Sequence, residues 1–176
     1  MKTMTLIRHA KSSWKEPMLQ DMDRPLNKRG QANAVMMGER LRSHQYMLEK
    51  IYSSPAVRAV ETAHLFEEAL KTRILKTRVR DIVELVPAIY TFNYEELLGW
   101  VRSLDRGVNN FCMVCHNPAI TDLFNFLTLS HIDKIPTCGV AVLELDITNW
   151  SQLGAGKAWV KFYDFPKSDK KPSPLV

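Results

Sequence analysis

The sequence contains no apolar run that approaches the roughly 20 residues needed to cross a bilayer. Its first residues, MKTMTLIRHAK, hold only a short apolar stretch before a charge, which is too short for the apolar core of a secretory signal. The three cysteines are an odd number, which argues against a disulfide framework. We therefore expect a cytoplasmic protein without a membrane partner.

Two of the cysteines, Cys112 and Cys115, form a C-x-x-C pattern that can indicate redox chemistry or a metal site. The pattern lies within an expected strand, where residues three apart face opposite sides of the sheet. A zinc site would also need two more ligands nearby. We interpret both cysteines as small buried hydrophobic residues, and we expect neither a metal nor a cofactor.

The net charge of +5 has two interpretations, a basic face for nucleic acid or a local cationic pocket for an anionic substrate. The 24 Lys and Arg residues are spread along the chain, without the interleaved aromatic residues of a single-strand groove. Charge alone favours neither interpretation. The motifs described below favour the pocket, so we expect no nucleic-acid partner.

The chain of 176 residues is long enough for one domain with a substantial core, and it shows no repeat and no Gly/Ser linker. Its composition, with 45% hydrophobic and 24% charged residues, is typical of a globular protein. The end of the sequence is rich in Lys, Pro and Ser. We predict a catalytic domain over residues 1–166 and a flexible basic tail over 167–176.

Short apolar strands alternate with amphipathic helices along the chain. We predict strands over 4–7, 49–54, 80–85, 110–115, 139–146 and 158–165, and helices over 27–44, 54–70, 93–104 and 117–127. The expected N-caps of the helices are Asn27, Ser54, Asn93 and Asn117. This order predicts an α/β fold, a three-layer α/β/α sandwich with a mainly parallel sheet and an antiparallel element near the C-terminus.

Polar side chains follow several of these strands directly. Arg8 and His9 follow the first strand, Arg58 comes soon after the second, Glu84 ends the third, and His116 follows the central strand. Ligands of open parallel sheets bind outside the carboxyl ends of the strands. Two arginines, two histidines and a carboxylate at one edge predict a pocket for a phosphoryl group. Glu84 has two possible interpretations, a general acid or a polar residue at the end of a strand.

Each residue type suits phosphoryl chemistry. Arginine presents a planar fork of donors that matches phosphate oxygens two at a time. Nearby guanidinium groups disfavour a charged imidazole, so a ring nitrogen of a histidine is free to attack. A second histidine, if protonated, could stabilise charge on the transferred oxygens. Arginines at the same edge make a metal between the histidines a poor alternative.

Other charged and titratable residues carry weaker signals. His44 and His64 lie on expected helices without a partner pattern, and we interpret them as surface residues or residues with satisfied hydrogen bonds. His131 lies in a connection and is interpreted as structural. Arg24 and Lys11 could line the rim of the pocket, but we interpret them as solvated charges.

Four blocks resemble, in order and spacing, the histidine phosphatase superfamily and more narrowly its small SixA-type phosphohistidine phosphatases. The blocks are LIRHAKSSW, DRPLNKRGQANA, SSPAVRAVETA and VCHNPAI. The resemblance implies that His9 is the nucleophile that becomes phosphorylated, beside Arg8. It further implies that Arg58 is the second phosphate ligand and that His116 completes the pocket. The reaction would be a metal-independent transfer to His9 followed by hydrolysis.

The sequence departs from the family pattern in three places. Ala10 stands where the family has glycine, Asn117 stands where one branch has an aspartate proton donor, and Glu84 is the nearest match to the glutamate of other branches. Without a strong proton donor, the leaving nitrogen of a phosphoramidate departs more readily than an alkoxide. The resemblance therefore favours protein phosphohistidine as the substrate.

Two other functions stay open at this stage. One is a phosphomonoesterase that acts on small phosphorylated metabolites and depends on Glu84. The other is a module that binds a phosphorylated ligand without turnover. The sequence leaves the physiological substrate, the pathway and the oligomeric state open.

Overall fold

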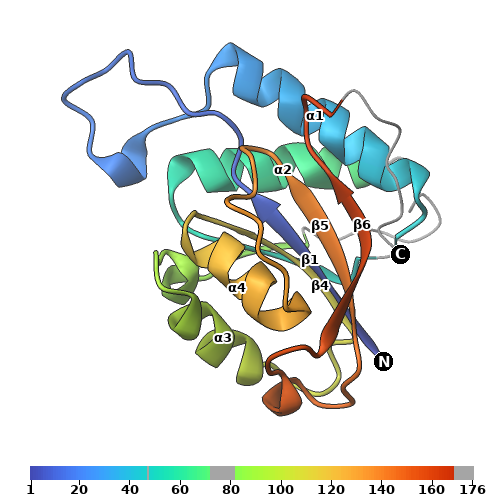
Figure 1. The fold of residues 1–176 in the computed structure, drawn as a ribbon. Helices are drawn as coiled ribbons and strands as arrows, with labels where there is room; N and C mark the ends of the chain where they lie inside the picture. The colour runs from blue at the N-terminus through green and yellow to red at the C-terminus, as the bar shows by residue number, and fades with distance from the viewer. Residues whose placement is uncertain (47, 72–81, 169–176) are drawn as a thin grey trace.

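A single mixed sheet forms the centre of the fold (Figure 1). The computed structural model describes residues 1–46, 48–71 and 82–168. Within them the strands are β1 (Lys2–Arg8), β2 (Lys50–Ser53), β3 (Val83–Leu85), β4 (Asn110–Cys115), β5 (Val140–Leu145) and β6 (Ala158–Asp164). They lie in the order β3-β2-β4-β1-β5-β6, with β1 to β4 parallel and with β5 and β6 antiparallel to their neighbours. The predicted sheet is confirmed.

Helices cover both faces of this sheet (Figure 1). Helices α1 (Lys28–Ser43) and α2 (Val57–Lys71) pack together on one face, and α3 (Tyr94–Arg102) and α4 (Ala119–Thr128) pack together on the other. Short 3-10 helices occur at η1 (Asp21–Asp23), η2 (Pro87–Ile89) and η3 (Trp150–Gln152). The predicted three-layer sandwich is therefore confirmed.

The central strand β4 is apolar because both of its faces are covered. Cys112 packs in the core beneath α1 and α2, whereas Cys115 packs in the core beneath α3 and α4. Both thiols are buried and unpaired, and burial raises the pKa of Cys115 to about 12. The expectation that the C-x-x-C pair serves as two buried hydrophobic residues on opposite faces is confirmed.

Two of the four predicted helix caps are present. Asn27 accepts a hydrogen bond from the Gly30 amide at 2.8 Å, and Asn93 accepts one from the Glu95 amide at 2.9 Å.

The other two helices begin later than predicted. Helix α2 begins at Val57, beyond Ser54, whose hydroxyl lies 2.8 Å from the His116 ring. Helix α4 begins at Ala119, with Pro118 as its N-cap residue, and the Asn117 side chain bonds to Thr121 instead. In both places a polar side chain expected to cap a helix has another partner.

The C-terminal part of the chain is described as far as Ser168. This residue bonds to Asp164 through its hydroxyl and to Phe165 through its amide. Most of the predicted tail, 169–176, lies outside the described residues, as does the beginning of the third predicted strand at 80–81. The boundary at residue 166 stays a prediction. In the described part of the chain, no helix has the length and apolar character that a membrane span requires.

Candidate active site

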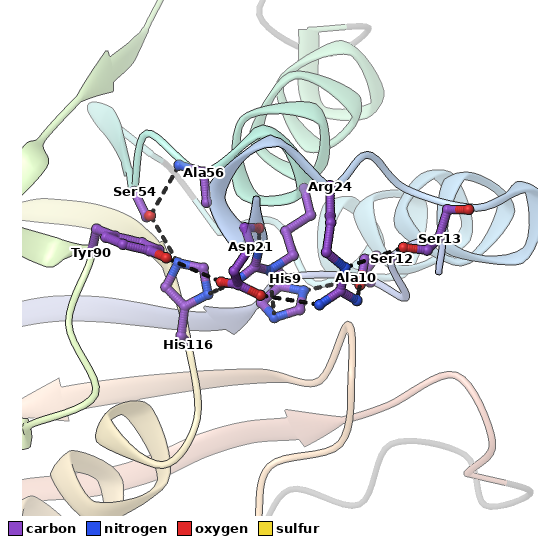
Figure 2. A network of polar contacts seen from close by, with 11 residues as sticks. His9, Ala10, Ser12, Ser13, Asp21, Arg24, Ser54, Ala56, Tyr90 and His116 are labelled. Atoms are coloured by element: carbon purple, nitrogen blue, oxygen red, sulfur yellow. Dashed lines mark hydrogen bonds and ion pairs between the residues drawn. The ribbon is translucent and has the colours of Figure 1, made fainter. Parts of the chain in front are cut away.

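The register of two central strands brings the two candidate histidines together. Strands β1 and β4 are parallel neighbours in which Arg8 lies opposite Cys115. His9 and His116 each come one residue later, and the His9 amide donates to the Cys115 carbonyl at 3.1 Å. The two imidazole rings therefore meet at the carboxyl edge of the sheet, with their centroids 5.0 Å apart (Figure 2).

The contacts of His9 determine which of its ring nitrogens is free. Nδ1 lies 2.8 Å from the Ala10 carbonyl oxygen, which can only accept, so Nδ1 carries the proton. Nε2 then carries the lone pair, which accepts a hydrogen bond from Arg58 Nε at 3.4 Å. Burial, followed by the charges of Arg58 and Arg8, lowers the pKa of His9 to about 4. At neutral pH this nitrogen is therefore unprotonated.

His116 lies deeper in the same cluster. Its Nδ1 is 3.4 Å from Arg58 Nη2, which can only donate, and its Nε2 is 2.8 Å from the Ser54 hydroxyl (Figure 2). The ring packs edge-on against Tyr90, with centroids 5.3 Å apart. Burial, then the neighbouring His9 and Arg58, lowers the pKa of His116 to about 3. The free pocket therefore holds this ring neutral, and only an added negative charge, such as a phosphoryl group, would favour its protonation.

The two candidate phosphate-binding arginines reach this edge from different elements. Arg58, from the first turn of α2, is buried and lies against both imidazoles. Arg8, at the end of β1, donates from Nη1 to the Ile135 carbonyl at 2.8 Å. Its Nε is buried and has no hydrogen-bond partner within the described residues. Since a buried unpaired donor is costly, an anion that accepts from Arg8 would be bound favourably.

An aspartate from the loop before α1 completes this polar cluster. Asp21 Oδ2 accepts from Arg58 Nη2 at 2.7 Å and from the Tyr90 hydroxyl at 3.0 Å. The backbone carbonyl of Asp21 also accepts from Arg58. Burial alone would raise the pKa of this carboxyl, but hydrogen bonds and charge from Arg58, Tyr90 and Arg24 hold the pKa below its ordinary value. Asp21 is therefore ionised at neutral pH.

Arg24 holds the other oxygen of this carboxylate. Its Nη1 lies 3.0 Å from Asp21 Oδ1, and its Nη2 donates to the Ser12 hydroxyl at 2.7 Å. The guanidinium also stacks on Trp14, 3.2 Å from the ring centroid. Only 8% of Arg24 is exposed, so its interpretation as a solvated charge is wrong.

These groups surround an open cavity of about 730 Å³. Arg8, His9 and Arg58 line one end, and His116 lies buried behind them. The further cationic residues of the lining are Lys11, Arg24, Arg29, Lys134 and Lys167. Asp21 is the single acidic side chain among the described residues that line it. The cavity is thus strongly cationic around one fixed carboxylate.

A comparison with known proteins agrees with this arrangement. Residues 4–82, which hold Arg8, His9 and Arg58, match the model of the histidine phosphatase superfamily, branch 1. Three of the five predicted site residues therefore lie within the matched region. Members of this superfamily are phosphatases, which are hydrolases.

Similar proteins cover most of the chain. An uncharacterised chloroplastic protein of Arabidopsis thaliana is 26% identical over 159 residues, which are 86% of this chain and 70% of that protein. The fold matches the putative phosphohistidine phosphatase SixA of Agrobacterium tumefaciens, with a TM-score of 0.74 and 22% identity over 94% of this chain and 98% of that one. A protein histidine phosphatase SixA complexed with tungstate has the same TM-score, with 18% identity over 93% and 97%.

The fold is also similar to that of a phosphatase with a small-molecule substrate. The mycobacterial glucosyl-3-phosphoglycerate phosphatase has a TM-score of 0.63 and 13% identity over 91% of this chain and 97% of that one. At these identities the structural likeness establishes the histidine phosphatase fold alone.

One predicted site residue lies away from this pocket. Glu84 lies on the edge strand β3, three strand positions from β1 and therefore about 14 Å away at the usual strand spacing. Its carboxylate is exposed and pairs with Lys50 Nζ at 2.8 Å. Of its two interpretations, the polar strand end agrees with this position, and the general acid does not.

The segment after β3 enters the pocket through a different residue. Tyr90 follows η2 and contacts both His116 and Asp21. Neither Tyr90 nor Asp21 was predicted from the sequence, because both lie at short 3-10 helices that give no detectable periodicity. The available signals were the D-x-x-R spacing of Asp21 and Arg24 and an aromatic hydroxyl soon after a strand.

The other histidines and Lys11 lie outside the polar cluster or at its rim. His44, His64 and His131 are exposed and do not line the cavity. Lys11 is exposed on the cavity lining. Within the described residues, non-glycine positive φ angles occur at Gln45, Leu129 and Cys138, so the backbone at Ala10 does not require a glycine. In the same part of the chain, no group of three or more His, Cys, Asp or Glu side chains could hold a metal ion.

The buried neutral histidines predict a fold that weakens in mild acid. An unfolded histidine binds a proton near pH 6.5, whereas His9 and His116 in the folded protein resist protonation down to pH about 4 and about 3. Between these values the unfolded chain binds more protons, so the free energy of unfolding falls as pH falls. The slope is about 1.4 kcal/mol per pH unit for each proton.

Urea denaturation at a series of pH values checks this expectation. His9→Gln removes one of the two groups and should lose less free energy of unfolding than the wild type between pH about 6.5 and about 4.5. The exposed His131→Gln is the control and should follow the wild type. Equal acid sensitivity of His9→Gln and wild type would contradict the assigned burial of the His9 charge.

Proposed function

We propose that this protein hydrolyses phosphohistidine in a phosphorylated protein through a phosphorylated His9 intermediate, without a metal ion. The observation that carries the proposal is the state of His9. Its Nδ1 proton is held by the Ala10 carbonyl, and its Nε2 lone pair lies beside the Arg58 guanidinium at the end of an open cationic cavity. That is the geometry of a nucleophile next to an anion-binding group.

The proposed reaction has two steps. In the first, His9 Nε2 attacks phosphorus, the bond from phosphorus to the substrate nitrogen breaks, and its electron pair returns to the substrate imidazole. In the second, water attacks the phosphorylated His9, which releases inorganic phosphate and restores the free ring. Arg8 and Arg58 bind the phosphoryl oxygens in both steps, and His116 supports the charge on them.

The acidic groups of the cavity favour a phosphoramidate over a phosphate ester as the substrate. An alkoxide leaving group needs a proton at the moment of cleavage, whereas an imidazole leaves without one from the enzyme if its second nitrogen is already protonated. The acid in the cavity is Asp21, which is ionised at neutral pH and has no proton to give. Glu84, the other candidate acid, pairs with Lys50 outside the cavity.

A small phosphomonoester is the second candidate substrate. The likeness in fold to the glucosyl-3-phosphoglycerate phosphatase supports it, as does a cavity of about 730 Å³, which is the size of a small-molecule site. The pairing of Glu84 with Lys50 argues against this candidate as it was predicted, because it depended on Glu84 as the acid.

The proposal is tested with a protein that carries radiolabelled phosphohistidine. The wild type should release inorganic phosphate, and a rapid quench should show transient label on this chain that is labile in acid and stable in base. Binding without label or release would support a non-catalytic module. Release from small phosphomonoesters alone would support the second candidate. Either result would overturn phosphohistidine as the substrate.

A cytoplasmic location remains part of the proposal. It is supported by the odd number of cysteines, of which Cys112, Cys115 and Cys138 are all buried and unpaired.

A further inference from the structure

The carboxylate of Asp21 occupies an unexpected place for a pocket that binds phosphate. It contacts Arg58, one of the two candidate phosphate ligands, and lies close enough to influence the charge of both imidazoles. Its side chain is 47% exposed, so a ligand in the cavity can reach it. A fixed negative charge here repels the phosphoryl group of any substrate, and this cost must be offset by something in the substrate it accepts.

The carboxylate is held in place independently of Arg58. Arg24 binds Oδ1 and the Tyr90 hydroxyl donates to Oδ2 (Figure 2). Arg24 does so from a buried position, bonded to Ser12 and stacked on the Trp14 ring. If Arg58 turned onto a bound phosphoryl group, Asp21 would keep its other two partners. Oδ2 would then lose its strongest donor, and a lone pair would become available to the bound substrate.

A phosphohistidine substrate supplies the missing donor. Its imidazole carries the phosphoryl group on one nitrogen and can carry a proton on the other, which makes the ring cationic. His9 shows the same arrangement on the enzyme side, where the Ala10 carbonyl holds the Nδ1 proton while Nε2 faces the phosphoryl site. In a transfer between two imidazoles, the proton on the second nitrogen of each ring needs an acceptor. The Ala10 carbonyl is this acceptor for His9, and the carboxylate of Asp21 in the cavity lining can be the acceptor for the substrate ring.

We propose that Asp21 accepts a hydrogen bond from the second ring nitrogen of the substrate phosphohistidine and thereby selects phosphohistidine over phosphomonoesters. During transfer the bond from phosphorus to the substrate nitrogen breaks, its electron pair stays on that nitrogen, and the bond from phosphorus to His9 Nε2 forms. The substrate leaves as a neutral imidazole that keeps the proton facing Asp21. A phosphomonoester has no cationic group for this carboxylate, so it meets only the repulsion. This inference rests on the proposed function and deepens it.

The test compares two substrates with two variants. Asp21→Asn keeps the shape of the side chain and removes its charge, and Asp23→Asn changes a neighbouring exposed acid that does not line the cavity. For each protein, kcat/KM is measured with a phosphohistidine protein and with para-nitrophenyl phosphate. Thermal unfolding of each variant is measured alongside.

Asp21→Asn should lower kcat/KM for the phosphohistidine protein by roughly 10- to 100-fold, the range for a lost charged hydrogen bond. The same variant should retain or increase kcat/KM for para-nitrophenyl phosphate, and Asp23→Asn should resemble the wild type with both substrates. An equal loss with both substrates would mean that Asp21 only positions Arg58, and would overturn the inference. If the wild-type protein did not hydrolyse the phosphohistidine protein, the proposed function would be overturned instead.

A pH profile provides a second measurement that does not depend on how the variant folds. The preference of the wild type for phosphohistidine, expressed as the ratio of the two kcat/KM values, should fall as pH rises and the substrate ring loses its proton. The charged and titratable groups around Asp21 are Arg24, Arg58, the Tyr90 hydroxyl and the imidazoles of His9 and His116. Burial and the hydrogen bond to Asp21 raise the pKa of Tyr90, and burial lowers the pKa of His9 to about 4 and that of His116 to about 3, so none of these three groups titrates near neutral pH. A ratio that is constant across the titration of the substrate imidazole would contradict a contact with its N–H.

Discussion

His9→Ala is expected to reduce phosphate release from a phosphohistidine protein by roughly a thousand-fold or more, a typical cost of removing a nucleophile. Alanine cannot form the covalent intermediate, and no neighbouring group replaces it, because the other imidazole of the cluster is buried and bonded to Ser54. The measurement is the initial rate of phosphate release, together with the yield of labelled enzyme after a quench. Both should fall to background.

His131→Ala is the matched control for this variant, because it removes an exposed imidazole outside the cavity. It should keep the rate of the wild type. Appreciable turnover by His9→Ala, with label on another residue, would show that the nucleophile has been misassigned. The cluster would then have to be reinterpreted around His116.

Arg58→Ala has the second largest expected effect, a loss of roughly 100- to 1000-fold in kcat, or about 3 to 4 kcal/mol of transition-state stabilisation. Arg58 contacts both imidazoles and Asp21, so its loss would remove the proposed fork for phosphoryl oxygens and leave Asp21 facing His9. Arg58→Lys should recover only part of the rate, because an ammonium group keeps the charge but not the planar fork.

Steady-state kinetics of these variants, with thermal unfolding as a check on the fold, measure this effect. Arg42→Ala, on α1 and outside the cavity lining, is the control and should have the activity of the wild type. If Arg58→Ala kept the wild-type kcat and changed only KM, Arg58 would contribute to binding of the ground state alone.

Much of the fold could be predicted because apolar periodicity reports burial directly. The apolar stretch within β4 indicated a strand covered on both faces. Its residues Cys112 and Cys115 lie on opposite faces of the sheet, as expected. The starts of α2 and α4 could not be predicted in the same way. Ser54 and Asn117 are good capping residues, but His116 and Thr121 compete for their side chains, and such competition exists only in three dimensions.

The candidate site could be predicted in part, for a reason that lies in the topology. The rule that ligands bind at the carboxyl ends of parallel strands identified Arg8, His9 and His116, because β1 and β4 are adjacent in the centre of the sheet. The same rule failed for Glu84, because strand order is not encoded in local pattern and β3 is an edge strand. Asp21 lies in a long loop whose path depends on the buried Arg24.

The pairing of Arg8 with Cys115 has a consequence for how this sheet can vary. A strand advances about 3.3 Å per residue and turns successive side chains to opposite faces. Adding or deleting one residue in either β1 or β4 would therefore shift one imidazole along the sheet and rotate it away from the other, even if every apolar position were refilled. The lengths of the two strands therefore set the relative position of His9 and His116, and the proposed chemistry constrains these lengths as well as packing does.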